Sequence, residues 1–575
     1  MSGDPVLRAL AQNRLDHLTR QMGHVMTRTA RSPIFAQAHD FSCFLADGHG
    51  AVVAQADGIP IHTGSGGFAV RAILRDASPV AEGDVFLLND PYLAGGNHLP
   101  DWVVSVPAFA GGRPVGFACV RAHQSDIGGG AAGTYNPDAT EIFHEGIRLP
   151  VLRLAERGAV RDDLWRLLLA NTRTPDLLDG DLRAMIGAAR IGAAGMARLA
   201  GELGAAADTV FAEILAHAEA LQRAAFRALP PGTHIGEETT DTDARTTQPV
   251  LVRAAVTIRE DGSARIDFTG SSPQLGGFKN SPYANTVSAV GLALAAFFDP
   301  AIPRNEGRLR CVEVLAPEGS CVNPRPPAPV TMCTVFLAHE IIHAVWRALG
   351  RADPARAPAG WAKNLFGVMS GRRDDGTVWV GYHAQAAAGA GAVRGRDGFD
   401  SIGHLCTLGG LAIPNVETTE RDFPVRVLRQ EFRCDSAGAG QWRGGSGVHY
   451  AVRLLADATQ SFRGEGIGTG GGYGVAGGGE GAAGSMAILW PDGREEAAPR
   501  YGLGRTPAGT ELHAASAGGG GWGDPRARDP AAVLADLLDG IISPEAARSV
   551  YAVATTEDGR AIDEAATRAM REEQG

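Results

Sequence analysis

The sequence contains almost no lysine. Only Lys279 and Lys363 occur among 575 residues, and the chain carries a formal net charge of −11. Arginine supplies the other basic side chains without forming a dense run, so the electrostatic footprint that nucleic-acid binding requires is missing. Neither lysine belongs to a G-x-x-x-x-G-K-[ST] loop, the usual phosphate cradle. We therefore expect no nucleic-acid partner, and we expect any nucleotide chemistry to take place on another chain.

Cysteine is also sparse. Seven cysteines are scattered along the chain, and none forms a C-x-x-C pair. An odd number of dispersed cysteines favours reduced thiols over a disulfide framework or a cysteine zinc site. The first residues lack the basic patch and apolar segment of a secretory signal, and no apolar run is long enough to span a bilayer. These absences predict a cytoplasmic protein with no membrane partner.

Hydrophobic periodicity divides the chain into regions of different character. Residues 1–160 begin with a helical pattern over 5–31 and then read as β-rich, with paired strands on either side of tight turns. Residues 161–228 are helical, residues 229–520 alternate strand-like and helical runs, and residues 521–575 form a helical tail. The sequence therefore predicts a mixed α/β (α+β) fold of several units, with a β-rich N-terminal region, a central helical segment and a mixed α/β C-terminal region.

One run stands out for its glycine content. Residues 464–479 are so rich in glycine that we interpret them as turns and bulges between short strands, rather than as a phosphate-binding loop. A second glycine-rich loop, residues 518–525, precedes the predicted helical tail.

A predicted β hairpin brings three possible metal ligands together. His98 and Asp101 stand before one strand and His123 stands after the other, with the turn expected near Gly112. Residues paired across such a turn have numbers that sum to roughly 224 to 226, and cross-strand neighbours lie about 4.5–5.5 Å apart at Cβ. Asp101 and His123 then meet at one end of the hairpin, and His98 can fold over them.

Two imidazoles and one carboxylate are the ligand set of an open divalent-metal site, where water or substrate occupies the remaining positions. Asp90, Asp126 and Glu145 lie nearby in the sequence as candidates for acid–base duty or for supporting the ligands. The spacing alone leaves open the alternative of ordinary loop-end polar residues, because a one-residue register slip sends a side chain to the other face. A structural metal in a non-catalytic scaffold is a further alternative, although structural sites normally use four protein ligands.

A second motif competes for the metal. His339-Glu340-Ile-Ile-His343 is a formal H-E-x-x-H, which on a helix places two imidazoles on one face for zinc. No histidine follows at the metzincin spacing, and no glutamate occurs between residues 344 and 416 as a third ligand. We therefore interpret the pair as helix-surface or interface residues and keep a zinc protease only as a minor alternative.

Several short motifs follow one another along the chain in a fixed order. The N-terminal ones are Asp40-Phe-Ser-Cys43, Ile59-Pro-Ile-His62-Thr-Gly64, Asn89-Asp-Pro-Tyr92, Gly95-Gly-Asn-His-Leu-Pro-Asp101, Arg121-Ala-His123, Asp126-Ile-Gly-Gly129 and Glu145-Gly146. Asn280-Ser-Pro282 and Arg443-Gly-Gly-Ser-Gly447 continue the series. In these motifs and their order the chain resembles the B-type subunit of the hydantoinase/oxoprolinase family, which includes the alpha subunits of acetone and acetophenone carboxylases.

The resemblance implies a hetero-oligomer. ATP is bound by a separate A-type subunit, which phosphorylates a carbonyl oxygen, and the B-type chain completes the conversion at a divalent metal such as Mn, Zn or Fe. By position, His98, Asp101 and His123 resemble the metal ligands of the carboxylase branch. We expect Asp126 and Glu145 to act as catalytic acid–base residues, and we expect substrate contacts from His62, Asp90, Tyr92, Arg121 and Gln124.

The family pattern is not matched everywhere. Gln124 stands where many members have a second histidine, and Asn97 replaces the threonine of a Gly-Gly-Thr-His version. These departures remove no proposed ligand, but they alter the expected substrate contacts. The function we expect is an ATP-dependent cyclic amidase that opens a hydantoin, N-methylhydantoin or 5-oxoproline type ring. The alternative is the alpha-type subunit of an ATP-dependent ketone carboxylase.

Overall fold

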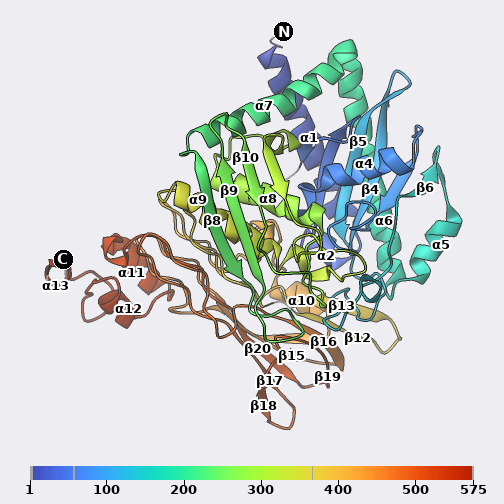
Figure 1. Ribbon diagram of the computed structural model, residues 1–575. Helices are drawn as coiled ribbons and strands as arrows, with labels where there is room; N and C mark the ends of the chain where they lie inside the picture. Colours follow the sequence, from blue (N-terminus) through green and yellow to red (C-terminus); the bar gives the residue numbers. More distant parts are fainter. Residues whose placement is uncertain (1–3, 56–57, 366, 573–575) are drawn as a thin grey trace. The chain divides into compact units, whose positions relative to one another are not determined.

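The computed structural model describes residues 4–572, apart from 56–57 and 366. The fold is mixed α/β, as the sequence predicts. The chain divides into two compact units, which are described separately below. Figure 1 labels their helices and strands. The first unit comprises Met1–Ala348, Arg373–Val380 and Cys406–Ile413, and the second comprises Leu349–Arg372, Gly381–Leu405 and Pro414–Gly575. The four-segment division expected from the sequence stays a prediction.

A seven-stranded antiparallel sheet dominates the N-terminal part of the first unit. Its strand order is β2-β1-β5-β4-β3-β6-β7. Side chains alternate between the two faces, so Phe117 and Cys119 of β5 share one face with Arg121 and His123. The strands are β1 (Phe41–Asp47), β2 (Val52–Gln55), β3 (Val85–Leu88), β4 (Asp101–Ala110), β5 (Arg113–His123), β6 (Leu152–Glu156) and β7 (Ala159–Val160).

Helices cover both faces of this sheet. On one face, α4 (Gly66–Asp76) packs its Val70 and Ile73 against an apolar cluster that includes Phe44 and Phe117. On the other face, α6 (Pro175–Leu203) packs on β4 and β5 and also contacts α1 (Pro5–Thr29). Because helices cover both faces of the sheet, β1 is buried along its whole length.

Small residues set the close approach of α6. A side chain at Gly192 would meet the Cβ of Ala118 and the sulfur of Met22, and one at Gly195 would meet Leu18. The helical segment expected after residue 161 consists of α5 (Asp162–Ala170), α6 and α7 (Ala207–Arg227).

A second sheet of the first unit has the order β11-β10-β9-β8. Buried and half-buried positions alternate in β9 and β10, which indicates that one face of these strands lies on the core. Gly236 of β8 lies against the backbone of Ala344 in α9. The elements are β8 (Gly232–Thr239), β9 (Leu251–Ile258), β10 (Ala264–Asp267), β11 (Val312–Leu315), α8 (Tyr283–Phe297), η3 (Glu306–Leu309), η4 (Thr331–Thr334) and α9 (Ala338–Ala352).

Two short helices complete this unit. They are α2 (Pro33–Ala36) and α3 (Pro60–Thr63). The second of them contacts β1 and α8, and it carries His62.

The second unit is largely β. One of its sheets has the order β14-β15-β20-β17-β18, and β16 pairs with both β12 and β19. The strands are β12 (Val368–Arg372), β14 (Val425–Phe432), β15 (Val448–Leu454), β16 (Ala458–Arg463), β17 (Ser485–Leu489), β18 (Glu495–Ala497), β19 (Tyr501–Thr506) and β20 (Glu511–Ala515), while the boundary between the units crosses β13 (Val378–Tyr382).

Glycine in this unit does more than make turns. The amide of Gly519 donates to the carbonyl of Gly445, that of Gly438 donates to Gly519, and that of Gly472 donates to Gly518, at 2.8–2.9 Å. A Cβ on Gly444 would clash with the carbonyl oxygen of Gly519. Glycine-rich stretches from three parts of the chain therefore pack backbone against backbone. Our interpretation of residues 464–479 as turns and bulges misses this, because the partners lie far away in sequence.

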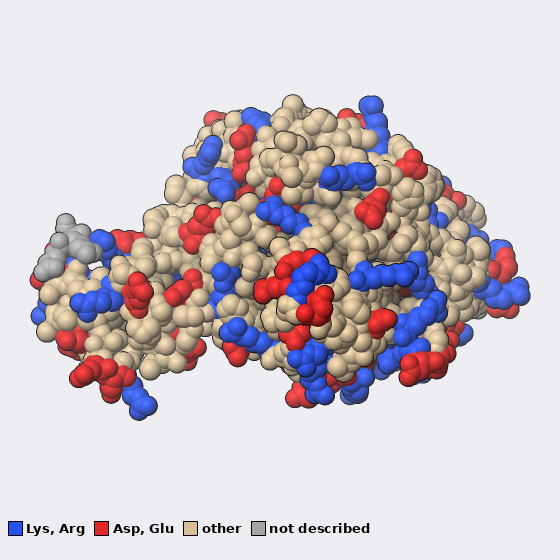
Figure 2. All heavy atoms as spheres, turned by 90° about the horizontal axis from the view of Figure 1, so that it is seen from below, with Lys and Arg blue, Asp and Glu red and all other residues tan. Residues whose placement is uncertain are grey.

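Short helices occupy much of the stretch after residue 529. Asp529 caps α11 (Pro530–Leu538) and Ser543 caps α12 (Pro544–Ser549), each through its side-chain oxygen. The helices α10 (Val416–Asp422) and α13 (Glu564–Glu572) complete the unit. No helix among the described residues is both long enough and apolar enough to cross a bilayer. On the face drawn in Figure 2, acidic and basic side chains are intermixed.

Candidate metal centre

The hairpin of β4 and β5 has the predicted register. Asp101 pairs with His123, and the turn contains Gly111 and Gly112, both with positive φ. His98 belongs to the loop that leads into β4, and its carbonyl accepts a hydrogen bond from the amide of Asp101. The three expected ligands are thus held at one end of the hairpin by backbone pairing.

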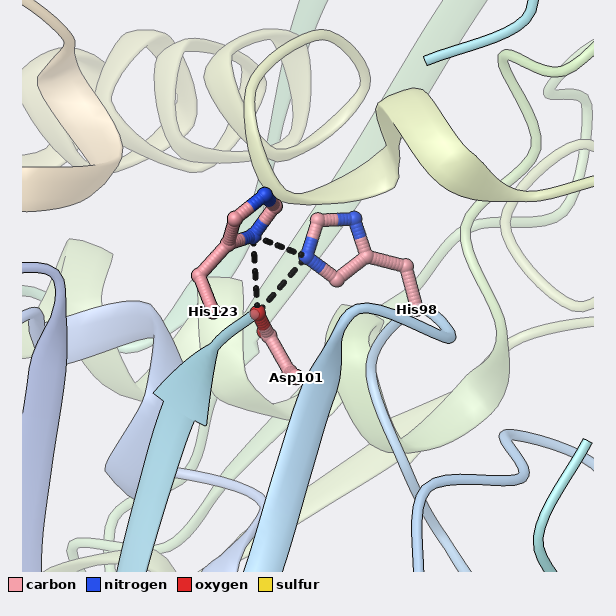
Figure 3. Close-up of side chains that lie close together, drawn as sticks. All are labelled: His98, Asp101 and His123. Carbon is pink, nitrogen blue, oxygen red and sulfur yellow. Dashed lines mark hydrogen bonds and ion pairs between the residues drawn. The ribbon is translucent and has the colours of Figure 1, made fainter. Parts of the chain in front are cut away.

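Three donor atoms of these residues converge (Figure 3). Asp101 Oδ1 lies 2.8 Å from His98 Nε2 and 3.2 Å from His123 Nδ1, and the two ring nitrogens are 3.2 Å apart. All three side chains are buried. Ligand atoms that share one ion at about 2.0–2.2 Å lie roughly 2.8–3.6 Å from one another. The spacing therefore matches three corners of a metal coordination sphere.

The hydrogen bonding of His98 also fits a cation. Its Nδ1 lies 2.6 Å from the carbonyl oxygen of Thr331, so Nδ1 carries a hydrogen. In a neutral ring, Nε2 then presents a lone pair toward the carboxylate of Asp101. Two acceptors 2.8 Å apart require a proton or a metal ion between them. The Thr331 carbonyl is thus the kind of outer partner that orients a metal-binding imidazole.

Electrostatics couple the protonation of these groups. Burial raises the pKa of Asp101, but the neighbouring imidazoles outweigh burial and hold it well below its ordinary value. Burial lowers the pKa of His98, but the charge and hydrogen bond of Asp101 raise it above its ordinary value. Without a cation, a protonated His98 therefore pairs with an ionised Asp101, and a metal would replace that proton.

A third imidazole lies against the same carboxylate. His62 Nε2 is 3.3 Å from Asp101 Oδ2, which accepts no hydrogen bond from the described part of the chain, and 3.7 Å from Asp40 Oδ1. Burial lowers the pKa of His62 to about 3, which keeps the ring neutral. Burial and the charge of Asp101 raise the pKa of Asp40 to about 8. His62, expected as a substrate contact, thus lies beside the cluster, against the oxygen of Asp101 that does not take part in the convergence.

Arg121 lies two residues before His123 on the same strand face. Its Nη1 donates to the carbonyl of His62 at 2.6 Å and also to Ser65 and Asn97. Its Nε and Nη2 are buried and have no hydrogen-bond acceptor among the described residues. One edge of the guanidinium is thus fixed, while the other edge presents two donors.

The remaining expected site residues hold loops in place. Both carboxylate oxygens of Glu145 accept from the Val330 amide, and Oε1 also accepts from the Thr331 amide, at 2.8–3.0 Å. Burial raises the pKa of Glu145 to about 7. Glu145 therefore anchors the segment whose Thr331 carbonyl holds His98.

Asp126 binds the backbone and side chain of Arg173 and the amides of Gly128 and Gly133. The carboxylate of Asp90 pairs with Arg148, and the Tyr92 hydroxyl donates to the Ala328 carbonyl. The Gln124 amide donates to the Ala122 carbonyl. None of these contacts reaches the three converging atoms.

Two neighbours of the cluster escape the sequence-based prediction. Tyr135 stacks on His123 with ring centroids 5.6 Å apart, and Thr331 supplies the carbonyl for His98. Asp40 belongs to one of the family-like motifs, but the motif alone predicts no role for it. Thr331 lies 233 positions from His98, so no local pattern could place it.

The competing H-E-x-x-H motif lies in α9 as expected. Its side chains are buried, so our interpretation of the two histidines as helix-surface or interface residues is wrong for this chain. Glu340 accepts a hydrogen bond from the amide of Leu337 at the start of the helix. His343 Nδ1 lies 3.5 Å from Glu238. Across the described parts of the chain, His98, Asp101 and His123 form the only group of three or more candidate ligands that converge. The motif therefore lacks a converging third ligand there.

Comparison with known proteins agrees with the resemblance seen in the motifs. The family model described as Hydantoinase B/oxoprolinase matches residues 4–525. The chain belongs to the hydantoinase B/oxoprolinase family. It is 34% identical to the beta subunit of the caprolactamase of Pseudomonas jessenii, over 99% of both chains, and 30% identical to the B subunit of a putative D-/L-hydantoinase of Pseudomonas sp. (strain NS671), over 99% and 98%.

Solved structures resemble the chain as well. The crystal structure of the ATP-dependent caprolactamase from Pseudomonas jessenii aligns with a TM-score of 0.88 at 33% identity, over 100% of both chains. A nucleotide-free structure of acetone carboxylase aligns with a TM-score of 0.87 at 24% identity, over 99% of this chain and 83% of the other. The second likeness establishes a shared fold.

Proposed function

We propose that this chain is the B-type subunit of an ATP-dependent cyclic amidase, with a divalent metal held by His98, Asp101 and His123. The observation that carries the proposal is the convergence of three buried donor atoms within 2.8–3.2 Å, one of them oriented by the Thr331 carbonyl. The named relatives support the reaction class, because one is part of a caprolactamase and another is part of a putative hydantoinase.

The proposal divides the work between two chains. An A-type partner binds ATP and phosphorylates the carbonyl oxygen of a lactam or hydantoin, because this sequence has no phosphate-binding loop of the usual kind. The activated ring then reaches this chain, where water adds to the activated carbon and the ring C–N bond breaks, with the nitrogen leaving as an amine. A second water then hydrolyses the resulting acyl phosphate to a carboxylate and free phosphate. A bound metal would polarise the carbonyl or lower the pKa of the attacking water.

The chain's own residues would orient the reactants. His62 remains neutral beside Asp101, and a pKa of about 3 suits it to hold the carboxylate in place rather than to act as a base. The Nε and Nη2 donors of Arg121 suit an oxyanion, because a guanidinium edge binds two oxygens of a carboxylate or phosphate in parallel. Glu145 would keep the Thr331 segment in place. Acid–base roles for Asp126 and Glu145, and substrate contacts by Asp90, Tyr92 and Gln124, stay predictions.

The experiment is reconstitution with the A-type partner from the same genome. We expect the reconstituted enzyme to open a lactam or hydantoin ring in the presence of ATP. Chromatography detects the ring-opened product, which we expect to be lost with His123→Ala. An ATP-dependent consumption of bicarbonate with a ketone, and no ring opening, would instead select the carboxylase alternative.

A further inference from the structure

A second candidate ligand site lies beside the metal centre. A half-open cavity of about 390 Å³ is lined by residues of the first unit alone, from β2, α3, α8, η3 and residues 407–410. This volume suits a small organic molecule. Pro60, Thr63 and Gly64 line the cavity, while His62 in the same short helix contacts Asp101. The cavity and the metal centre therefore share α3 as a wall.

Arg308 is the unusual residue of this cavity. It is 5% exposed, and its Nη2 donates to the Gln222 side chain at 3.2 Å and to the Leu294 carbonyl at 3.5 Å. Its Nε is buried without an acceptor, and no carboxylate pairs with it among the described residues. Buried arginine is rare unless a negative charge accompanies it, since an uncompensated buried charge is costly.

The charges around the cavity leave this arginine uncompensated. Glu306 also lines the cavity, but its Oε1 pairs with Arg71 at 2.8 Å and its Oε2 accepts from the Val52 amide at 3.0 Å. Arg304, a further lining residue, lies near enough to act on Arg308 electrostatically. Burial and the charge of Arg304 lower the pKa of Arg308 to about 10, so it stays charged at neutral pH. A negative charge inside the cavity would compensate Arg308.

The rest of the lining indicates the remainder of the ligand. Leu292 and Ala295 of α8 and Leu309 of η3 contribute apolar surface, and Val52 adds more from β2. We propose that this cavity binds a small carboxylate with a short apolar chain, with the carboxylate on Arg308 and the chain against α8. This binding site goes beyond the proposed function. The ring-opened product of a lactam would be one member of this ligand class.

The test measures binding to the full-length chain by isothermal titration calorimetry. The probes are hexanoate, and inorganic phosphate as the anion without an apolar chain. We expect hexanoate to bind more tightly than phosphate. Arg308→Gln removes the charge but keeps hydrogen-bonding groups, and we expect it to weaken hexanoate binding about ten- to hundredfold.

A pair of neighbouring variants guards against misfolding of the arginine variant. Ala295→Phe fills the cavity and should abolish binding, whereas Ala296→Phe, one residue further along α8, is exposed and should leave binding unchanged. The proposal is wrong if the wild-type chain binds no hexanoate, if phosphate binds as well as hexanoate, or if Ala295→Phe binds like Ala296→Phe. The assay needs no ATP, partner or metal, so its failure is distinct from failure of the proposed activity.

Discussion

Two regions of the first unit carry histidines at spacings typical of metal sites. Among the described residues, three candidate ligands converge in one of these regions and not in the other. His98 and His123 come from a loop and a strand end and meet at Asp101. His339 and His343 come from one helix, where spacing alone places their rings 4.2 Å apart. Helical periodicity brings two ligands together at no cost, but a third must come from another element. The hairpin register supplies that element for the first region.

The largest difference between the two regions should be in metal content. We expect His123→Ala and Asp101→Ala to lose stoichiometric metal, because each removes one of three converging donors. His343→Ala should retain it. Elemental analysis of the three purified variants, with circular dichroism to confirm folding, checks this. If His343→Ala loses metal and the other two variants keep it, the metal is bound at the helix motif and not at the hairpin.

A smaller loss of metal affinity is expected when Glu145 is replaced, because its carboxylate accepts hydrogen bonds from the Val330 and Thr331 amides and not from a candidate ligand. Glu145→Gln weakens the grip on the Val330 and Thr331 amides and so loosens the carbonyl that orients His98. Loss of such an outer partner typically costs about 10- to 100-fold in metal affinity. Competition with a chromogenic chelator measures this. Glu340→Gln is the matched control in the other region, and an equal loss there would contradict the positioning role.

The pH dependence of stability should differ in sign between the two regions. In the metal-free chain, Asp101 raises the pKa of His98 above its ordinary value, despite burial. The stabilisation of the folded chain by protonated His98 is therefore present below pH 6.5 and is lost as pH rises through the folded-state pKa. Burial lowers the pKa of His343, so its contribution is present above pH 6.5 and is lost as pH falls.

Thermal unfolding from pH 5 to 9 can separate these contributions. With His98→Gln, the melting temperature should fall less as pH rises than it does in the wild type. With His343→Gln, it should fall less as pH drops. The same pH slope in both variants would show that neither group titrates as its surroundings indicate. Saturating metal should suppress the alkaline effect alone, because the metal replaces the proton of His98.

The smallest effect concerns His343 itself. Its contact with Glu238 at 3.5 Å is shared with Arg347, which lies 3.1 Å from the same oxygen. His343→Ala leaves Glu238 paired, so we expect a loss of about 1–3 kcal/mol in the free energy of unfolding, mainly from the space vacated. Urea denaturation measures it. A loss far above this range would give the helix motif a larger structural role than its contacts indicate.

The sequence predicts the candidate site where local rules determine it. A two-residue side-chain period and a glycine turn place Asp101 opposite His123, and the structure confirms that register. The helical spacing of His339 and His343 correctly predicts α9. The supporting contacts escape prediction because they join distant segments. Glu145 reaches Thr331 across 186 positions, and no periodicity or capping signal spans that separation.

The packing of the glycine-rich stretches in the second unit escapes prediction for a similar reason. Gly519 lies beside Gly445 and Gly438 because all three lack a side chain, a condition visible only once the segments are together. Propensity describes a glycine by its own freedom to bend. Here glycine matters for what it leaves out between two backbones.

That packing has a genetic consequence. Any change in the first two bases of a glycine codon either stops translation or encodes a residue with a Cβ. At Gly444, Gly518 and Gly519, a Cβ would clash with a carbonyl oxygen of a neighbouring stretch. At these three positions, every single-base change that alters the amino acid therefore introduces a clash or ends the chain. A mutational scan should find this part of the chain far less tolerant than helical positions such as Gly187 and Gly201, where an added Cβ meets nothing.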